Sequence, residues 1–283
     1  MSHLFFRYIS ITANYTDQWE KWWKNPDQVK LYQFMGKDNV PFHTVIFPCS
    51  LIGSGDAYTL LHHVSTTEFL NYEDGKFSKS RGIGVFGNNV QDTGLSVNLW
   101  RYYLLANRPE CKPTRKRSCY LLFFFVCVCV CAAKDSQFTW NDFVLRINSE
   151  LVANLGNFVS RVLKFCKVKF GGVVPEIHLK DVDKAFLAEI SGKLKNYIEA
   201  LEGVKLREGL IVLMDISRTG NEFLTSNSLN NALYENDNAR CGTLIAIAVN
   251  LAYVLASLIH PYMPSASDTI LKQIHAPVSA FLV

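Results

Sequence analysis

The apolar residues between positions 151 and 165 recur at intervals of three and four residues, which is the spacing of an amphipathic α-helix. Gly171-Gly172 and then Pro175 end this helix, because glycine accepts the left-handed conformation that closes helices and proline cannot continue one. A helix with one apolar face must bury that face against other elements. With further helices predicted over residues 181–202, 204–218 and 237–259, the second half is predicted to be an antiparallel helix bundle. The apolar stripe consists of Leu151, Leu155, Phe158, Val162 and Phe165.

The first hundred residues alternate between strand-like and helix-like segments. Residues 8–12 (YISIT) and 30–35 (KLYQFM) are rich in strand-forming side chains, whereas residues 16–24 (TDQWEKWWK) begin with a helix-capping threonine and acids. A helix is expected over residues 42–52 despite Pro48, and residues 69–82 predict a strand, a turn at Asp74-Gly75 and an exposed loop. This alternation favours an α/β architecture.

Composition limits the class of protein. A chain with 49% hydrophobic and 19% charged residues is globular, and its net charge of +4 permits an RNA partner without requiring one. Five of the eight cysteines crowd into residues 111–131, and Cys49, Cys166 and Cys241 are predicted to be buried free thiols. Because the chain has no C-x-x-C pair, no zinc site is expected. The first residues lack the features of a signal peptide, which favours a reducing, cytosolic setting.

Residues 111–133 (CKPTRKRSCYLLFFFVCVCVCAA) match neither neighbouring region. The apolar run at 120–133 is shorter than the roughly 20 residues of a membrane-spanning helix. Its alternating Val and Cys also suggest a strand, although both faces would be apolar. A third reading is a translated intron, since a TG repeat encodes Val-Cys and a pyrimidine tract encodes Leu and Phe. The genomic sequence around these codons tests the intron reading, and fractionation of soluble from membrane protein tests the membrane reading.

The stretch Lys76-Phe77-Ser78-Lys79-Ser80 has the chemistry of a phosphate-binding loop. Its lysines offer mobile positive charge and its serines offer hydroxyl donors, which together suit the charge that develops on a departing pyrophosphate. Glycines on both sides would let the loop close over a nucleotide. The spacing alone is weak evidence, and a solvated basic turn is the alternative.

Several ordered matches make the signal specific. Residues 8–12, 31–48 (LYQFMGKDNVPFHTVIFP), 71–87 (NYEDGKFSKSRGIGVFG), 91–94 (QDTG) and 261–264 (PYMP) together resemble methionyl-tRNA synthetases, which are class I aminoacyl-tRNA synthetases. The resemblance implies a partial Rossmann-type α/β catalytic domain followed by an all-α antiparallel helix bundle. It also implies ATP with Mg²⁺ as a substrate, methionine and tRNA(Met) as partners, and a cytoplasmic location. The expected domains are 1–107 (catalytic), 108–137 (a linker with the insert 111–133) and 138–283 (anticodon-binding).

Site residues follow from the same resemblance. In the loop that matches KMSKS, Lys79 would stabilise the transition-state phosphates and Lys76 would assist. Phe77 replaces the usual methionine, and Arg7 replaces the glycine that usually precedes Tyr8. Tyr8 could instead be an ordinary strand aromatic, and His43 an ordinary core or helix histidine. The resemblance places ATP on Asp38, Lys76, Ser78, Lys79 and Ser80, and methionine on Tyr8 and His43.

The bundle carries a second candidate site. Asn154, Asn157, Arg161 and Lys164 share the face opposite the apolar stripe, and Asn157 and Arg161 match the family's anticodon-reading pair. An amide and a guanidinium suit the open edges of loop bases, while Lys164, Lys167 and Lys169 could contact phosphates. The alternative is a solvated polar face. Ser228-Leu229-Asn230 stands where relatives often carry a Pro-Trp pair whose ring stacks on an anticodon base, which puts affinity or selectivity in doubt.

The chain has no HIGH motif, the second ATP-binding motif of class I synthetases. The family activity, methionine–tRNA ligation, is therefore expected of a longer protein, and this chain alone is predicted to be inactive or severely impaired. The alternative function is a non-catalytic helical module that binds tRNA or a protein partner. Protein partners of the multisynthetase type are a further expectation, and no membrane association is expected.

Overall fold

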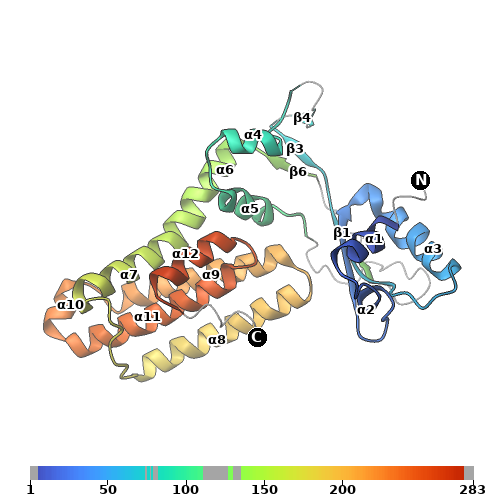
Figure 1. Cartoon of the computed structure of the whole chain (residues 1–283). Coiled ribbons are helices and arrows are strands. Elements are labelled where there is room, and N and C mark those ends of the chain that lie inside the picture. The colour runs from blue at the N-terminus through green and yellow to red at the C-terminus, as the bar shows by residue number, and fades with distance from the viewer. Residues whose placement is uncertain are drawn as a thin grey trace. The chain divides into compact units, whose positions relative to one another are not determined.

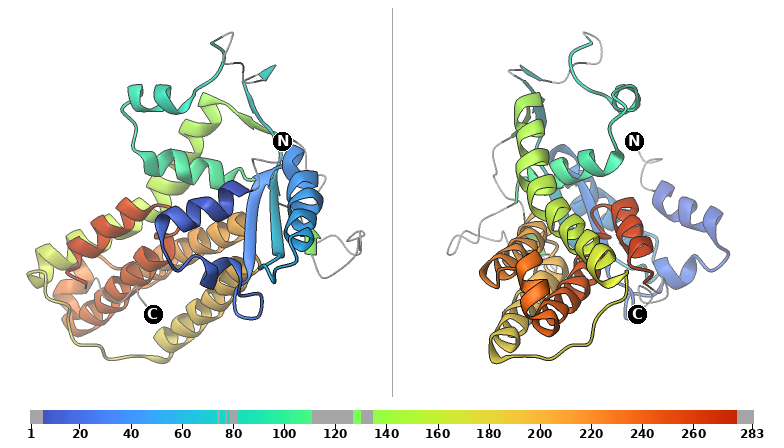
Figure 2. Two further views of the ribbon diagram at one scale, coloured as in Figure 1. Left: turned by 45° about the vertical axis from the view of Figure 1, so that its right-hand side comes forward. Right: turned by 90° about the vertical axis from the view of Figure 1, so that its left-hand side faces the viewer.

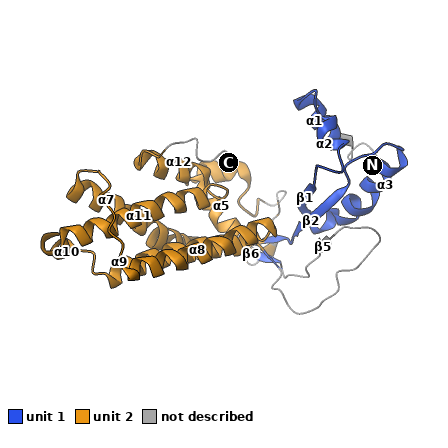
Figure 3. Cartoon of the chain, turned by 90° about the horizontal axis from the view of Figure 1, so that it is seen from below, with its two compact units in different colours: residues 1–70, 109–136 blue, residues 71–108, 137–283 orange. Residues whose placement is uncertain are grey.

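The computed structural model describes residues 6–73, 75, 76, 78, 82–110, 127–129 and 135–276, with the backbone alone at Phe6, Lys76 and residues 127–129. The contacts divide the chain into two compact units (Figures 1 and 3). Unit 1 comprises residues 1–70 and 109–136, and unit 2 comprises residues 71–108 and 137–283. The domain boundaries expected from the sequence stay a prediction.

Unit 1 contains a parallel sheet with the strand order β1-β2-β5. Strand β1 (Leu31–Gly36) runs alongside β2 (Leu61–Thr67), and β2 pairs in turn with β5 (Cys127–Cys129). The strand predicted at 30–35 is therefore confirmed. The helix predicted over 42–52 is also confirmed, as the π-helical segment η3 (Phe42–Ile46) and α3 (Phe47–Gly53). Pro48 lies in the first turn of α3, where its missing N–H is best tolerated.

The strand predicted at 8–12 is wrong, because these residues lie in helix α1 (Phe6–Tyr15). Tertiary contacts override the strand propensity of the side chains. Ile9 packs against the apolar cluster around Trp23. The Thr12 hydroxyl donates to the Tyr8 carbonyl one turn earlier (3.1 Å) and accepts a hydrogen bond from the Trp23 indole N–H (2.9 Å). The helix is therefore fixed by what its residues contact and not by their intrinsic preference.

The helix predicted over 16–24 forms as the short α2 (Glu20–Trp23). Trp23 is only 8% exposed and packs with Phe47 and Leu51. Cys49 is exposed, so its predicted burial is wrong: it lies on the face of α3 opposite Phe47 and Leu51. Cys166 and Cys241 are buried free thiols, as predicted.

Unit 2 begins with the hairpin that carries the lysine-serine stretch. Strand β3 (Leu70–Tyr72) pairs antiparallel with β4 (Gly75–Lys76), and β6 (Ser136–Phe138) lies on the other side of β3. Since Tyr72 pairs antiparallel with Gly75, the chain reverses between these two residues, which confirms the predicted strand and reversal; Asp74 lies outside the described residues. Glu73 takes a left-handed conformation (φ 46°) and its N–H donates to the Phe138 carbonyl (2.8 Å).

The rest of unit 2 is helical, which confirms the predicted bundle (Figure 2). The predicted amphipathic helix is part of one uninterrupted helical run from Trp140 to Phe170, ended by Gly171 in the left-handed conformation (φ 64°). The elements are α4 (Gly87–Asp92), α5 (Val97–Ala106), α6 (Trp140–Arg146), the π-helical η5 (Ile147–Gly156), α7 (Asn157–Phe170), α8 (Asp181–Glu202), α9 (Leu206–Ser226), α10 (Asn231–Asn236), α11 (Asn238–Ile259) and α12 (Pro264–Gln273).

Helix α11 forms the centre of the bundle. It packs against α7, α9 and α12, and Leu244, Ala252 and Leu255 are completely buried. An 18-residue stretch of this helix has a mean hydropathy of 2.1, which would also suit a membrane span, but 67% of that stretch is buried inside the bundle. A core helix accounts for this composition. Of the segment 111–133, only the backbone of β5 is described, so its three readings stay open.

Candidate functional site

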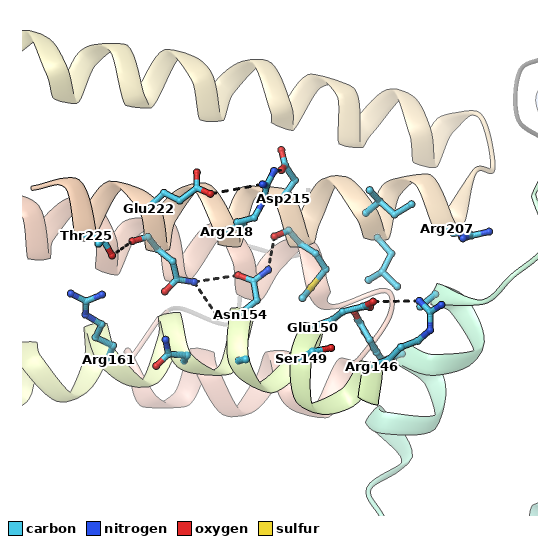
Figure 4. Close-up of a pocket in the computed structure, with 18 residues that line it drawn as sticks. Arg146, Ser149, Glu150, Asn154, Arg161, Arg207, Asp215, Arg218, Glu222 and Thr225 are labelled. Atoms are coloured by element: carbon cyan, nitrogen blue, oxygen red, sulfur yellow. Dashed lines mark hydrogen bonds and ion pairs between the residues drawn. The ribbon is translucent and has the colours of Figure 1, made fainter. Parts of the chain in front are cut away.

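A pocket of about 760 Å³ lies in unit 2 between the α6–η5–α7 run and α9, with α5 at one end (Figure 4). Both members of the predicted anticodon pair line it. Asn157 is the first residue of α7, and Arg161 follows one turn later. Their side chains therefore lie on one face of the helix and border the same hollow.

The pair keeps hydrogen-bonding capacity for a ligand. Asn157 is exposed, and its amide makes no hydrogen bond to any described residue. Arg161 is half-buried, and one guanidinium N–H donates to the Leu229 carbonyl (3.1 Å). A guanidinium has five N–H donors, so most of those of Arg161 remain available. An amide that both donates and accepts, next to a fixed cation, can hydrogen-bond the edges of unpaired bases.

Asn154 does not belong with this pair, although the sequence placed it on the same polar face. Its amide donates to the Met214 carbonyl of α9 (2.8 Å). Its oxygens accept hydrogen bonds from Asn221 of α9 at 3.1 and 3.2 Å. Asn154 therefore joins η5 to α9 and is occupied within the fold.

Two other arginines of the pocket are paired with acids (Figure 4). Arg146 contacts Glu150 (3.3 Å), and Arg218 contacts Glu222 (3.8 Å) and Asp215. Burial would raise the pKa of the Asp215 carboxyl, but hydrogen bonds from Arg218 and Lys193 outweigh it and hold that pKa below its usual range. These pairs neutralise much of the pocket wall, and sequence reasoning missed them although their spacings of three and four residues were visible.

The stretch Ser228-Leu229-Asn230 forms the turn between α9 and α10, beside Arg161. Leu229 is buried (5% exposed), and its carbonyl is the group that holds the guanidinium. The Asn230 side chain caps α10 by accepting a hydrogen bond from the Leu233 N–H (2.9 Å). This turn therefore offers Arg161 a carbonyl at the place where, by the resemblance, relatives often carry the Pro-Trp pair.

In unit 1 the predicted methionine-binding residues lie together. The Tyr8 hydroxyl is 2.8 Å from His43 Nε2, and His43 Nδ1 is 2.8 Å from the Asn39 carbonyl. Because a carbonyl only accepts, Nδ1 carries the proton, and Nε2 of a neutral ring then accepts from the Tyr8 hydroxyl. Asp38 is exposed in the turn η2 (Lys37–Asn39) and makes no hydrogen bond with this pair.

The predicted loop lysines belong to unit 2. Lys76 lies in β4, and Ser78 exchanges two backbone hydrogen bonds with Ile83 at 2.8 and 3.0 Å, which holds these two residues beside each other. Lys79 and Ser80 lie outside the described residues. The hairpin is tied to α6, because Glu73 accepts a hydrogen bond from the Trp140 N–H (3.1 Å) and the Tyr72 hydroxyl accepts one from the Trp140 indole (3.1 Å). Among the described residues, no cluster of three or more His, Cys, Asp or Glu could hold a metal ion.

Two family models match most of the chain. A model of the class I tRNA synthetases of the methionine type matches residues 4–117 and 116–163, which include the hairpin, Asn157 and Arg161. The anticodon binding domain of methionyl tRNA ligase matches residues 174–281.

Curated relatives and solved structures agree with these models. The probable cytoplasmic methionine–tRNA ligase of Schizosaccharomyces pombe is 52% identical over 96% of this chain, and the human cytoplasmic enzyme is 48% identical, also over 96%. The chain spans 33% of the first relative and 28% of the second.

A solved Mycobacterium tuberculosis methionyl-tRNA synthetase in complex with methionyl-adenylate has a TM-score of 0.72 at 24% identity. It covers 91% of this chain, and the chain covers 47% of it. This likeness confirms the predicted fold class, an α/β part followed by a helical region. The chain belongs to the methionyl-tRNA synthetase family of class I aminoacyl-tRNA synthetases.

Proposed function

We propose that this chain supplies the anticodon-binding bundle and the phosphate-loop part of a cytoplasmic methionine–tRNA ligase, which activates methionine with ATP and transfers it to tRNA(Met). The observation that carries the proposal is the pocket that both the Asn157 amide and the Arg161 guanidinium line with donors available. Lys164, Lys167 and Lys169 continue along α7 and would contact phosphates. The domains 1–107, 108–137 and 138–283 are part of this proposal.

The binding of tRNA is testable on the chain itself. A stem-loop RNA with the methionine anticodon CAU should bind more tightly than the same stem-loop with an altered anticodon. Arg161→Ala should weaken the CAU complex by about tenfold or more, since a bidentate contact to a base discriminates by about 1–3 kcal/mol. Binding that ignores the anticodon and is unchanged by Arg161→Ala would refute the anticodon role.

For catalysis, Lys79 and Lys76 would stabilise the charge on the transferring phosphates, and Ser78, Ser80 and Asp38 would assist in binding ATP, which enters with Mg²⁺ as a substrate. The Tyr8–His43 pair would line the methionine site. Its fixed tautomer supports this role, because both side chains are oriented before any ligand arrives. Multisynthetase-type protein partners stay a prediction.

The isolated chain is proposed to be inactive or severely impaired. Two observations support this: the sequence has no HIGH motif, and β1, at the end of the described sheet, exposes 56% of Phe34 and 41% of Tyr32. Parallel sheets normally have both faces covered. Methionine-dependent ATP–pyrophosphate exchange by the purified chain, above the level of a Lys79→Ala variant, would overturn the proposal.

The second candidate function is a module that binds tRNA or a protein without chemistry. The pocket of unit 2 favours it, because every described group that lines it lies within that unit. Both candidate functions predict that this chain binds RNA with anticodon selectivity and does not catalyse pyrophosphate exchange. Restoration of exchange by an added polypeptide that contains the HIGH region would favour the ligase.

A further inference from the structure

The carbonyl that holds Arg161 belongs to a tightly defined turn. Helix α9 ends in a Schellman motif, in which the Leu229 N–H donates to the Leu224 carbonyl and the Ser228 N–H donates to the Thr225 carbonyl, both at 3.0 Å. Ser228 takes the left-handed conformation (φ 51°) that glycine usually occupies at this position. Both the Leu224 and Leu229 side chains are buried, so the turn is also fixed by apolar contact.

A buried ion pair is hydrogen-bonded to the first residue of the same turn. Arg240 of α11 donates to both oxygens of Asp183 of α8, at 2.5 and 2.9 Å. The Asp183 side chain is fully buried and that of Arg240 is 9% exposed. The same guanidinium also donates to the Asn227 side-chain oxygen (2.7 Å), and Asn227 is the residue that ends α9. The pair therefore connects α8 and α11 to the start of the turn.

Arg161 itself has a single described hydrogen bond to the fold, the one to Leu229. A long side chain with one anchor loses orientation when that anchor moves, because the remaining rotations of an arginine are free. The position of the Leu229 carbonyl, two residues after Asn227, therefore decides where the free N–H groups of Arg161 point.

We infer that Arg240, through Asn227 and the Leu229 carbonyl, is a positioning residue that sets the anticodon selectivity of Arg161. The inference rests on the proposed anticodon role of Arg161. In this chain the turn fixes the reading arginine by a backbone hydrogen bond. Arg240 is not among the residues that line the pocket, so its effect on RNA binding would pass through the turn.

The test uses Arg240→Lys in the full chain. Lysine keeps the positive charge beside Asp183, but it cannot bridge Asp183 and Asn227 with the planar geometry of a guanidinium. The matched control is Tyr197→Phe, which removes the buried hydrogen bond from the Tyr197 hydroxyl to the Leu258 carbonyl (2.6 Å) and does not touch the turn. Titrations measure binding of the CAU stem-loop and of stem-loops with each anticodon base changed in turn.

We expect Arg240→Lys to reduce the ratio of CAU affinity to altered-anticodon affinity by about five- to tenfold, a large part of what one bidentate base contact supplies. Binding of the altered stem-loops, which depends on phosphate contacts, should change less than twofold. Tyr197→Phe should leave the ratio unchanged. An Arg240→Lys protein whose ratio equals that of Tyr197→Phe overturns the inference, because a purely structural role weakens both RNAs alike.

If Arg240→Lys does not fold, Asn227→Ala removes the hydrogen bond from Arg240 to the turn, together with the one from the Asn227 amide to the Phe223 carbonyl (2.9 Å), and leaves the Arg240–Asp183 pair intact. The same affinity ratio then decides. The two proposals fail differently. If Arg161→Ala loses anticodon selectivity while Arg240→Lys and Asn227→Ala keep it, only the positioning role is refuted. Unchanged selectivity in Arg161→Ala refutes the proposed function itself.

Discussion

Gly220 in the middle of α9 lies at a close contact between helices of the bundle. A Cβ added at this position would lie 2.7 Å from a methyl carbon of Leu251 and 2.8 Å and 3.1 Å from two ring carbons of Phe158. Phe158 is completely buried and Leu251 is 5% exposed, so neither side chain has space to move into. The glycine therefore allows α7, α9 and α11 to approach one another.

Two effects of Gly220→Ala oppose each other. Alanine gains about 1 kcal/mol from its higher helix propensity. Overpacking in a filled core costs about 1–3 kcal/mol, and two contacts below 3.0 Å with buried groups place this site toward the upper part of that range. The variant is therefore expected to be less stable by about 1–2 kcal/mol.

Gly192 in α8 is the matched control. It is also inside a helix, but nothing lies within 4 Å of a Cβ built there. Gly192→Ala should gain the propensity term alone, about 1 kcal/mol, or about 2–4 °C in melting temperature. The assay is unfolding in urea and by heat, followed by far-UV circular dichroism, which reports on the helical unit. If Gly220→Ala stabilised the protein as much as Gly192→Ala does, the close approach of the three helices would be wrong.

Three further perturbations test other parts of the structure. Burial opposes ionisation of Asp183, but Arg240 outweighs it and lowers the carboxyl pKa, so the pair stabilises the fold above the unfolded value of about 3.9 and this stability is lost as pH falls below it. Asp183→Ala should accordingly cost about 3–5 kcal/mol near neutral pH, with a smaller difference from the parent chain in acid-unfolding titrations below about pH 4. Nitrogen NMR should show the His43 proton on Nδ1, and Tyr8→Phe should shift the Nε2 resonance while leaving Nδ1 protonated; a proton on Nε2 in the parent chain would contradict the assigned hydrogen bonds. Trp23→Ala should destabilise unit 1 by about 3–5 kcal/mol and leave unit 2 folded, measured by hydrogen exchange of the two units; equal loss of protection in both would argue against this separation.

The sequence predicted the bundle well because its helices are amphipathic or apolar over many turns. The stripe from Leu151 to Phe165 and the glycine end at Gly171 carry their own physical reasons, and the structure confirms both. The strand predicted at residues 8–12 is wrong because the propensity of YISIT was read without its tertiary contacts. Ile9 packs on the cluster around Trp23, and Thr12 accepts a hydrogen bond from the Trp23 indole, and neither contact can be read from those five residues.

The candidate site was predicted only in part, because its side chains can be read from the sequence but their tertiary partners cannot. Helical spacing placed Asn157 and Arg161 on one face, the resemblance singled them out, and both line one pocket. The partner of Arg161 is a main-chain carbonyl 68 residues away, and because every residue has a carbonyl, the sequence does not indicate which one is used. Asn154 shows the converse: its spacing matched the polar face, but its amide is occupied by Met214 and Asn221.

The uninterrupted helical run from Trp140 to Phe170 has a consequence for how this chain can change in evolution. Its first residue is bonded to the hairpin of Lys76, and Asn157 lies within it, so the helix sets a rotational phase between the two. One residue inserted into α6 would turn Asn157 by about 100° around the axis and out of the pocket. Insertions and deletions should therefore be absent from residues 140–157 of functional variants. The segment 111–133 precedes Trp140, so its length leaves this phase unchanged.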